Sequence, residues 1–268
     1  MNDILYLALG DSIATGTLHN FARVTSYTGH LYHILRKQGY RARMMSLARD
    51  GDTTRELLNK LGQNWFQNWV RRADLITLSI GGNNLMRAAS IPGFTSVCVP
   101  KAEAGVRAFC SDWEKIIQRL RALNPHCSLL VMTVYNPYNH TQTLSGGYRA
   151  DRGLWELTER YLRQINGVIE SQCQGRYRVV DIHTLFDSFS YGEKGRVVSL
   201  YSSGLYILRN PHPTSYGHWL IARAHADLLG RELAGHRVLP YPQGGIWSSR
   251  SFSISQYVTR RTFPTYRF

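Results

Sequence analysis

The sequence is poor in cysteine, and its cysteines show no metal-binding pattern. The four of them have neither Cys-x-x-Cys spacing nor a neighbouring histidine cluster, so we expect no metal site. Cys98 and Cys110 flank a segment that contains glycine, which leaves a disulfide between them open. Buried free thiols are the alternative.

The chain also lacks a long apolar segment near its beginning. Met1 is followed almost at once by the run Ile4 to Leu9, which is too short for a signal-peptide core or a membrane span. We therefore expect a cytoplasmic protein. If an export signal has been removed from this chain, the protein would instead be secreted.

Acidic residues are scarce: 18 Asp and Glu stand against 32 Lys and Arg, which gives a formal net charge of +14. The arginines are spread from Arg23 to Arg267 and form no single basic block. Such a surface attracts anionic lipid, polysaccharide or nucleic acid. No helix-turn-helix, zinc-ligand or aromatic RNA-platform pattern accompanies the charge, so we expect no specific nucleic-acid partner and leave peripheral attraction to anionic surfaces open. The oligomeric state is not predicted.

The pattern of apolar residues indicates an α/β protein. Five short apolar runs rich in β-branched residues predict strands at Ile4 to Leu9, Arg41 to Leu47, Leu75 to Ile80, Leu129 to Val134 and Tyr177 to Ile182. Helical spacing lies between them at His30 to Gln38, Thr53 to Leu61, Trp113 to Leu123 and Leu154 to Cys173. Alternating strands and helices predict a mainly parallel sheet covered on both faces, with reactive groups at the carboxyl ends of the strands.

A last amphipathic helix is predicted over Tyr216 to Leu233, with Trp219, Leu220, Ala224, Leu228 and Leu229 packed on the sheet. We therefore expect one domain over residues 1–235. Residues 236–268 form a basic, aromatic tail without helical periodicity, either an ordered arm, including a sheet-edge strand near Ser251 to Val258, or a disordered extension.

The first predicted strand runs directly into Gly10-Asp11-Ser12, which places the Ser12 hydroxyl at the carboxyl end of the strand. This position suits a nucleophile. The same three residues also make an ordinary turn and helix cap. The α/β-hydrolase pattern Gly-x-Ser-x-Gly is absent, because Ala14 occupies the place of its second glycine.

Two glycine-containing turns follow other predicted strands. The third strand ends in Gly81-Gly82-Asn83-Asn84, where the amide of Asn83 is placed to donate to an oxyanion, although a plain glycine turn reads the same way. After the second strand, the backbone N–H of Gly51 could donate to the same oxyanion. Each donor of this kind lowers the activation free energy by roughly 3 kcal/mol, because it hydrogen-bonds to a negative charge that develops only in the transition state.

A histidine between two prolines, His212, precedes the last predicted helix, and we take it as the candidate general base. A neutral imidazole within hydrogen-bond reach of a serine can accept its proton and return it to the leaving group. Packing or solvent exposure explains the other histidines considered, which are His30, His33, His183, His218 and His225.

Together these segments resemble the SGNH or GDSL hydrolase family. Its four blocks fall in order at Gly10-Asp11-Ser12, at Gly51, at Gly81-Gly82-Asn83-Asn84 and at His212-Pro213, across roughly residues 4–233. The resemblance implies a flavodoxin-like three-layer α/β/α sandwich around a five-stranded sheet. It also implies Ser12 as nucleophile, the backbone N–H groups of Ser12 and Gly51 with the Asn83 side chain as oxyanion hole, and His212 as base.

The sequence departs from that family in two places. The third block usually ends in Asp, and here Asn84 stands there. The Asp that usually lies three residues before the histidine is replaced by Arg209, which cannot accept the imidazole proton. We therefore predict a Ser-His dyad in which the amide oxygen of Asn210, or a main-chain carbonyl, accepts from the imidazole.

These observations predict a GDSL-type esterase or lipase that needs no metal or organic cofactor and acts through an acyl-enzyme. Short acyl esters, lipids and acetylated carbohydrates are all candidate substrates. Tyr138, Tyr148 and Trp155 could form an acyl or sugar pocket, or simply pack. The alternative is a catalytically weak module that binds a glycan or an anionic surface on the same scaffold.

Overall fold

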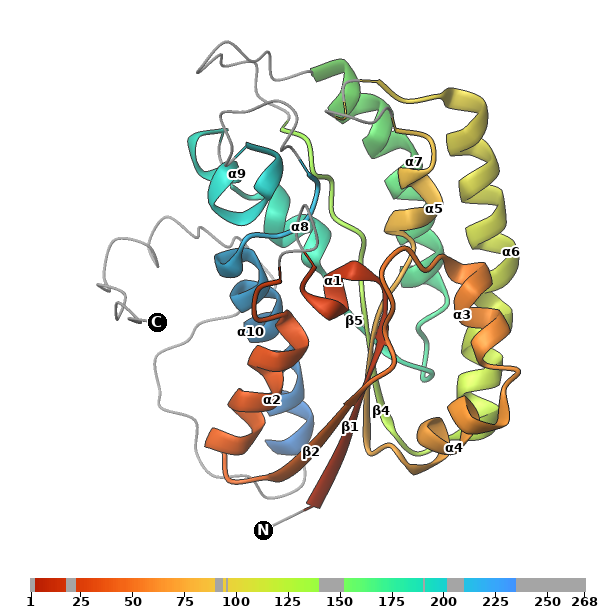
Figure 1. The fold of residues 1–268 in the computed structure, drawn as a ribbon, viewed down its shortest axis with the longest axis vertical. Coiled ribbons are helices and arrows are strands. Elements are labelled where there is room, and N and C mark those ends of the chain that lie inside the picture. The colour runs from red at the N-terminus through yellow and green to blue at the C-terminus, as the bar shows by residue number, and fades with distance from the viewer. Residues whose placement is uncertain are drawn as a thin grey trace.

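Five parallel strands form one sheet in the order β2-β1-β3-β4-β5 (Figure 1). The computed structural model describes residues 3–17, 23–89, 94, 96–139, 152–189, 191–201 and 210–234. The strands are β1 (Asp3–Gly10), β2 (Arg41–Ser46), β3 (Leu75–Ser79), β4 (Ser128–Met132) and β5 (Arg178–Val180). The predicted tail, residues 236–268, lies outside the described residues.

Helices cover both faces of the sheet, which confirms the three-layer α/β/α prediction (Figure 1). One face carries α3 (Thr54–Lys60), α4 (Asn64–Arg72), α6 (Val99–Leu123) and α7 (Arg152–Ser171). The other carries α2 (Tyr27–Lys37), α8 (Ile182–Asp187), α9 (Tyr191–Val197) and α10 (Ser215–Ala234). Two short helices, α1 (Ser12–Thr15) and α5 (Gly82–Met86), follow β1 and β3.

The two cores are built by alternation along each strand. In β1, Leu7 and Leu9 point into the core beneath α6, whereas Tyr6 and Ala8 point into the core beneath α2 and α10. All four side chains are fully buried. Strands buried on both faces read as continuous apolar runs, which is why the sequence marks them clearly.

Four predicted strands run past the observed carboxyl ends, those at β2 and β3 by one residue and those at β4 and β5 by two. At β4 and β5, side-chain hydrogen bonds take over where the strands end. Val134 was assigned to a strand, but its backbone N–H and C=O bond to the side chain of Asn166 at 2.8 and 2.9 Å. Asp181, also assigned to a strand, instead caps α8 by accepting from Thr184 N–H at 3.0 Å. The chain therefore leaves the sheet two residues earlier than expected in both places.

Helix α6 is much longer than the predicted segment Trp113 to Leu123, because it begins at Val99. Its first half crosses the end of α5 closely. A β-carbon on Gly105 would lie 1.9 Å from the carbonyl oxygen of Asn84, so only glycine permits this approach. Gly105 is thus required by the packing of α6 on α5.

The packing face predicted for α10 is right in part, because Leu229 is buried and Leu220, Ala224 and Leu228 pack against the same core. Its fully buried side chains include His218, Ile221, Ala222 and His225, whereas Trp219, Leu220, Ala224 and Leu228 are only half-buried, and Leu229 alone of the predicted set is buried. Two histidines occupy core positions, which hides the apolar stripe from a reading based on hydrophobic residues.

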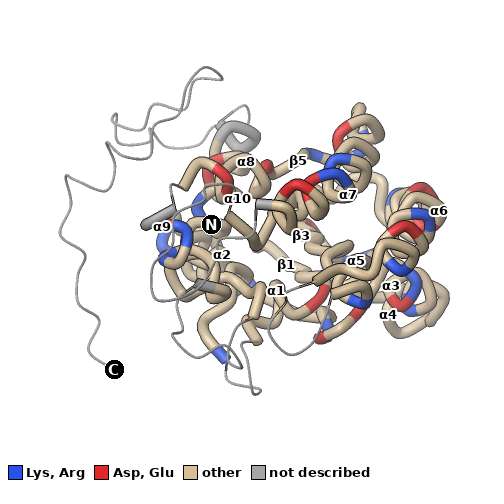
Figure 2. Tube along the Cα trace, turned by 90° about the horizontal axis from the view of Figure 1, so that it is seen from above, with Lys and Arg blue, Asp and Glu red and all other residues tan. Residues whose placement is uncertain are grey.

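Figure 2 shows basic and acidic residues side by side on α3, α6 and α7, and several of them form ion pairs, such as Arg163 with Glu159 on α7 at 3.2 Å. All four cysteines lie within the described residues, and each is a free thiol. Cys98 and Cys110 are therefore not paired, and Cys98 is exposed although free thiols were expected to be buried.

Burial keeps the two core histidines neutral. It lowers the pKa of His218 to about 3, with the nearby His212 and His30 adding to the shift, and it lowers the pKa of His225 to about 4. The Nδ1 of His218 accepts from Tyr27 N–H at 3.3 Å, and His225 stacks on the Tyr27 ring. Both rings therefore pack best in the neutral form, with one ring proton rather than two.

These histidines predict a loss of stability in mild acid. Between pH 6.5 and about 4, His225 is protonated in the unfolded chain but stays neutral in the folded protein. The free energy of unfolding therefore falls as pH falls, by about 1.4 kcal/mol per pH unit for each such histidine. In urea titrations, His225→Phe should flatten this slope by about that amount. The exposed His33→Gln serves as the matched control and should leave the slope as it is. An unchanged slope in His225→Phe would contradict the assignment.

Candidate active site

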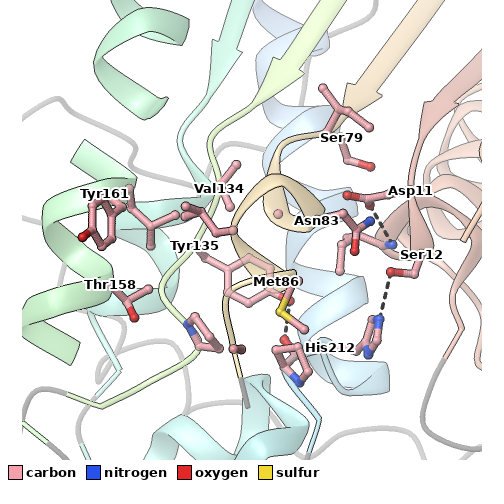
Figure 3. A pocket seen from close by; sticks show the side chains of 18 of the residues that line it. Asp11, Ser12, Ser79, Asn83, Met86, Val134, Tyr135, Thr158, Tyr161 and His212 are labelled. Carbon is pink, nitrogen blue, oxygen red and sulfur yellow. Dashed lines mark hydrogen bonds between the residues drawn. The ribbon is translucent and has the colours of Figure 1, made fainter. Parts of the chain in front are cut away.

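A deep pocket opens at the carboxyl edge of the sheet, between the ends of β1, β3 and β4 (Figure 3). Most of its walls are apolar, formed by side chains such as Met86, Phe94, Val97, Tyr135 and Tyr138. Ser12, Asn83 and His212 line it as well. The pocket thus joins a small polar corner to a long apolar interior.

Ser12 begins α1 immediately after β1, as the sequence predicts. The Asp11 side chain caps this helix by accepting from Ile13 N–H at 3.0 Å, and Asp11 N–H donates to Ser79 O at 3.1 Å on the neighbouring strand. These bonds fix the turn on both sides of the serine. As a result the Ser12 hydroxyl lies at the pocket and faces the loop that precedes α10.

His212 meets Ser12 across 200 residues of sequence: its Nε2 lies 2.8 Å from Ser12 Oγ (Figure 3). The loop that carries it is anchored on both sides. Tyr135 donates its hydroxyl to Pro211 O at 2.6 Å, and Ser199 N–H donates to His212 O at 2.8 Å. The structure therefore brings the predicted pair of side chains together, and hydrogen bonds on both sides of His212 position its loop.

Asn210 occupies the place behind the imidazole. Its Oδ1 lies 3.1 Å from His212 Nδ1 and also accepts from His212 N–H at 3.1 Å. If Nδ1 donates to this oxygen, Nε2 is left to accept the proton of Ser12. Arg209 lies outside the described residues. The carboxylates of Asp181 and Asp187 bond elsewhere, to Thr133 and to Trp155.

Asn83 lies beside Ser12 at the start of α5. Its Nδ2 donates to Asp52 O at 2.9 Å, which ties α5 to the loop after β2. Gly51, the next residue back along that loop, has a left-handed φ of 80° and is exposed. Gly51 is not among the residues that line the pocket, so its predicted role depends on the position of this loop.

Asn84 takes part in packing rather than facing the pocket. Its Oδ1 accepts from Thr54 N–H at 3.2 Å and its Nδ2 donates to Thr54 Oγ1 at 3.0 Å. Thr54 Oγ1 in turn lies 3.4 Å from the fully buried Asp112, which pairs with Arg55. An uncharged amide at position 84 suits this corner, because a second buried carboxylate beside Asp112 would repel it.

Asp11 is a buried carboxyl beside the nucleophile. Burial raises its pKa to about 7, the charges of Asp52 and Asp50 add to the rise, and the hydrogen bond from Ile13 N–H opposes it. At neutral pH this carboxyl is therefore divided between its neutral and charged forms. The polar corner of the pocket carries less negative charge than its sequence implies.

The aromatic residues proposed for the pocket divide into three cases. Tyr138 lines it and donates its hydroxyl to Phe94 O at 3.0 Å. Trp155 is not among the residues that line the pocket. Its indole N–H donates to Asp187 on α8 at 3.3 Å. Tyr148 lies outside the described residues. Tyr135 was not singled out, because nothing in sequence links it to Pro211.

Three further histidines considered from the sequence are structural or surface residues. His183 Nε2 lies 2.9 Å from the buried Glu159, and His33 is exposed. Burial lowers the pKa of His30, which is half-buried on α2.

Within the described ranges, no cluster of three or more His, Cys, Asp or Glu side chains could hold a metal ion. In the same part of the chain, no helix is both long and apolar enough to cross a membrane.

Several solved structures share this fold. An extracellular lipase from Streptomyces rimosus is 18% identical with a TM-score of 0.62, and the match covers 86% of this chain and 99% of that one. Phospholipase A1 from Streptomyces albidoflavus NA297 is 19% identical with a TM-score of 0.60, covering 82% and 98%. A family 3 carbohydrate esterase from Clostridium thermocellum is 18% identical with a TM-score of 0.56, covering 87% and 100%. At these identities the likeness concerns the fold.

Among curated proteins, the uncharacterized protein YpmR of Bacillus subtilis (strain 168) is 27% identical over 240 residues, which cover 85% of this chain and 82% of YpmR. The fold, with a serine and a histidine meeting at its carboxyl edge, is that of an SGNH-type carboxylic ester hydrolase. More particularly, the chain belongs to the GDSL-like Lipase/Acylhydrolase family, whose model matches residues 8–220.

Proposed function

We propose that this acylhydrolase cleaves esters of apolar acyl chains through an acyl-enzyme formed on Ser12. The observation that carries the proposal is the 2.8 Å contact between Ser12 Oγ and His212 Nε2 at the polar end of an apolar pocket. A nucleophile and its base within hydrogen-bond reach are what covalent acyl transfer requires.

The reaction proceeds in two steps. His212 Nε2 accepts the proton of Ser12 as Oγ attacks the ester carbonyl, and the protonated imidazole then donates that proton to the departing alcohol. An acyl group remains on Ser12. Water, activated by the same Nε2, attacks the acyl carbonyl and releases the acid, which restores the free serine.

The negative oxygen of each tetrahedral intermediate lies against three donors: the N–H groups of Ser12 and Gly51 and the Nδ2 of Asn83. The Asn83 amide uses one hydrogen on Asp52 O, which leaves its second hydrogen for the substrate. Donors held in place before the reaction stabilise the transition state without reorganisation.

Asn210 replaces the usual carboxylate. Its amide oxygen orients the imidazole by accepting from Nδ1–H at 3.1 Å, but it carries no charge to stabilise the imidazolium that forms. The base is therefore weaker than one backed by an aspartate. Tyr135, through Pro211, supplies part of the orientation instead.

The pocket favours an acyl chain over a sugar as the group held next to Ser12. Aliphatic and aromatic side chains form its walls. Tyr161 and Thr158 lie at the end away from Ser12, and the Thr158 hydroxyl is buried (Figure 3). Each methylene transferred into such a site contributes about 0.8 kcal/mol. The lipase and phospholipase A1 with the same fold act on lipids by name, in keeping with this assignment.

The direct test of the proposal is Ser12→Ala. We expect this variant to lose hydrolysis of p-nitrophenyl butyrate and all labelling by a fluorophosphonate probe, with its circular dichroism unchanged. The matched control is Ser188→Ala, at the end of α8. Hydrolysis that persists in Ser12→Ala would remove the proposed nucleophile. Absence of labelling in the unchanged protein, with tight salt-sensitive binding to an anionic polymer, would favour the binding module.

The role of Asn210 predicts opposite effects of two substitutions. Asn210→Ala should lower kcat roughly 10- to 100-fold, since the imidazole loses its acceptor. Asn210→Asp should raise kcat and move the acid limb of the pH-rate profile to higher pH, because a carboxylate favours the imidazolium. Asp181→Ala and Asp187→Ala are the controls. The dyad is wrong if either of them abolishes turnover while Asn210→Ala does not.

The acyl pocket predicts a change in chain-length preference. Thr158→Phe should fill the far end of the pocket and lower kcat/KM for p-nitrophenyl octanoate roughly tenfold or more, while leaving the acetate ester within about twofold. Gln164→Phe, on the exposed side of α7, is the matched control. Equal effects of Thr158→Phe on both esters would show that the acyl chain binds elsewhere.

A further inference from the structure

The loop between β2 and α3 is tied to the rest of the site at three nearly consecutive residues. Arg49 N–H donates to Gly10 O at 3.0 Å, at the end of the strand that leads to Ser12. Asp52 O accepts from the Asn83 side chain at 2.9 Å. Between these two bonds stand Asp50 and Gly51, so the third tie, made by Asp50, decides where Gly51 lies.

Asp50 reaches across to the end of α1, the helix that begins with Ser12. Its Oδ1 accepts from Thr15 Oγ1, and its Oδ2 accepts from Thr17 Oγ1 at 2.7 Å. Both carboxylate oxygens are thus engaged by hydroxyl donors from one segment. A carboxylate that receives two donors at once fixes direction as well as distance.

The hydroxyl proton of Thr15 has a second acceptor within reach, the backbone carbonyl oxygen of Ser12. Thr15 Oγ1 also lies 3.2 Å from Ser12 O, which already accepts from the N–H groups of Gly16 and Thr17. A hydroxyl has one proton to donate. While Asp50 accepts it, the carbonyl of Ser12 keeps only its helical bonds.

We propose that Asp50 is a positioning residue: its carboxylate locks the loop that carries Gly51 and Asp52 onto the helix that carries Ser12, and so sets the oxyanion donors against the nucleophile. This inference rests on the proposed Ser12 mechanism. It adds a residue to the site that touches neither substrate nor the reacting atoms.

The exposure of Asp50 separates this role from an ordinary contribution to stability. Hydrogen bonds of an exposed carboxylate compete with water and contribute little to folding. Small displacements of catalytic donors, in contrast, strongly affect rate, with about 1 Å costing up to roughly 100-fold. Loss of Asp50 should therefore affect the transition state far more than the folded state.

The test compares Asp50→Ala, Asp50→Asn and the double variant Thr15→Val/Thr17→Val, with p-nitrophenyl butyrate as substrate. We expect Asp50→Ala and the double variant each to lower kcat roughly tenfold, with KM within about twofold and the thermal midpoint nearly unchanged. Asp50→Asn keeps one acceptor and should fall between. The threonine variant retains the charge of Asp50, so it separates geometry from electrostatics. Combining all three substitutions should cost no more than Asp50→Ala alone.

A second readout follows the donors themselves. The inhibition constant of a boronic acid, whose tetrahedral adduct with Ser12 directs an oxygen at the donors, should rise in proportion to the fall in kcat. Asp3→Ala, which removes another exposed aspartate from an ion pair with Arg41, is the control for both measurements and should change neither.

The two proposals fail in different ways. If Ser12→Ala abolishes hydrolysis but Asp50→Ala retains the kcat of the unchanged protein, the positioning role is overturned and the mechanism stands. If the effects of Asp50→Ala and the threonine variant simply multiply, the contact between them is not what acts. If Ser12→Ala retains hydrolysis, the mechanism falls and this inference falls with it.

Discussion

Parallel pairing of β1 with β2 on one side and β3 on the other is the constraint on which the rest of the structure depends. In a parallel sheet the carboxyl ends of neighbouring strands lie at one edge, so the segments after these three strands must meet. Ser12, Gly51 and Asn83 each follow one of them. His212 instead comes from the loop before α10, which is hydrogen-bonded to Tyr135 in the segment after β4.

The acceptor behind the imidazole is an uncharged amide, although Asp50 and Asp52 lie close enough to Asp11 to raise its pKa. Asn210 is an amide, Asn84 is an amide, and burial leaves Asp11 partly protonated at neutral pH. The structure compensates with fixed geometry: hydroxyl, amide and backbone bonds hold each reacting group, and Asp50 acts on position from outside the pocket. Preorganised donors of this kind reduce what the base itself must supply.

The sequence allowed much of this fold to be predicted, because strands buried on both faces leave unbroken apolar runs and their ends carry glycine. The pairing of Ser12 with His212 was predicted from their positions in the sequence and from the family resemblance, and the structure brings the two side chains together. Local patterns could not reveal contacts made in space: the bond from Tyr135 to Pro211, the tie of Asp50 to Thr15 and Thr17, and the replacement of sheet partners by Asn166. The sequence did not predict His218 and His225 as core residues of α10, because a pattern of apolar residues does not mark buried polar side chains.

The most direct test of the central claim is to trap the covalent intermediate. The protein would be mixed rapidly with p-nitrophenyl butyrate, quenched in acid within the first turnover, digested and analysed by peptide mass spectrometry. The acyl-enzyme mechanism predicts a butyryl group on Ser12 in an amount matching the early release of p-nitrophenol. Continued turnover with no acyl group on any peptide, or with the acyl group on another residue, would contradict it.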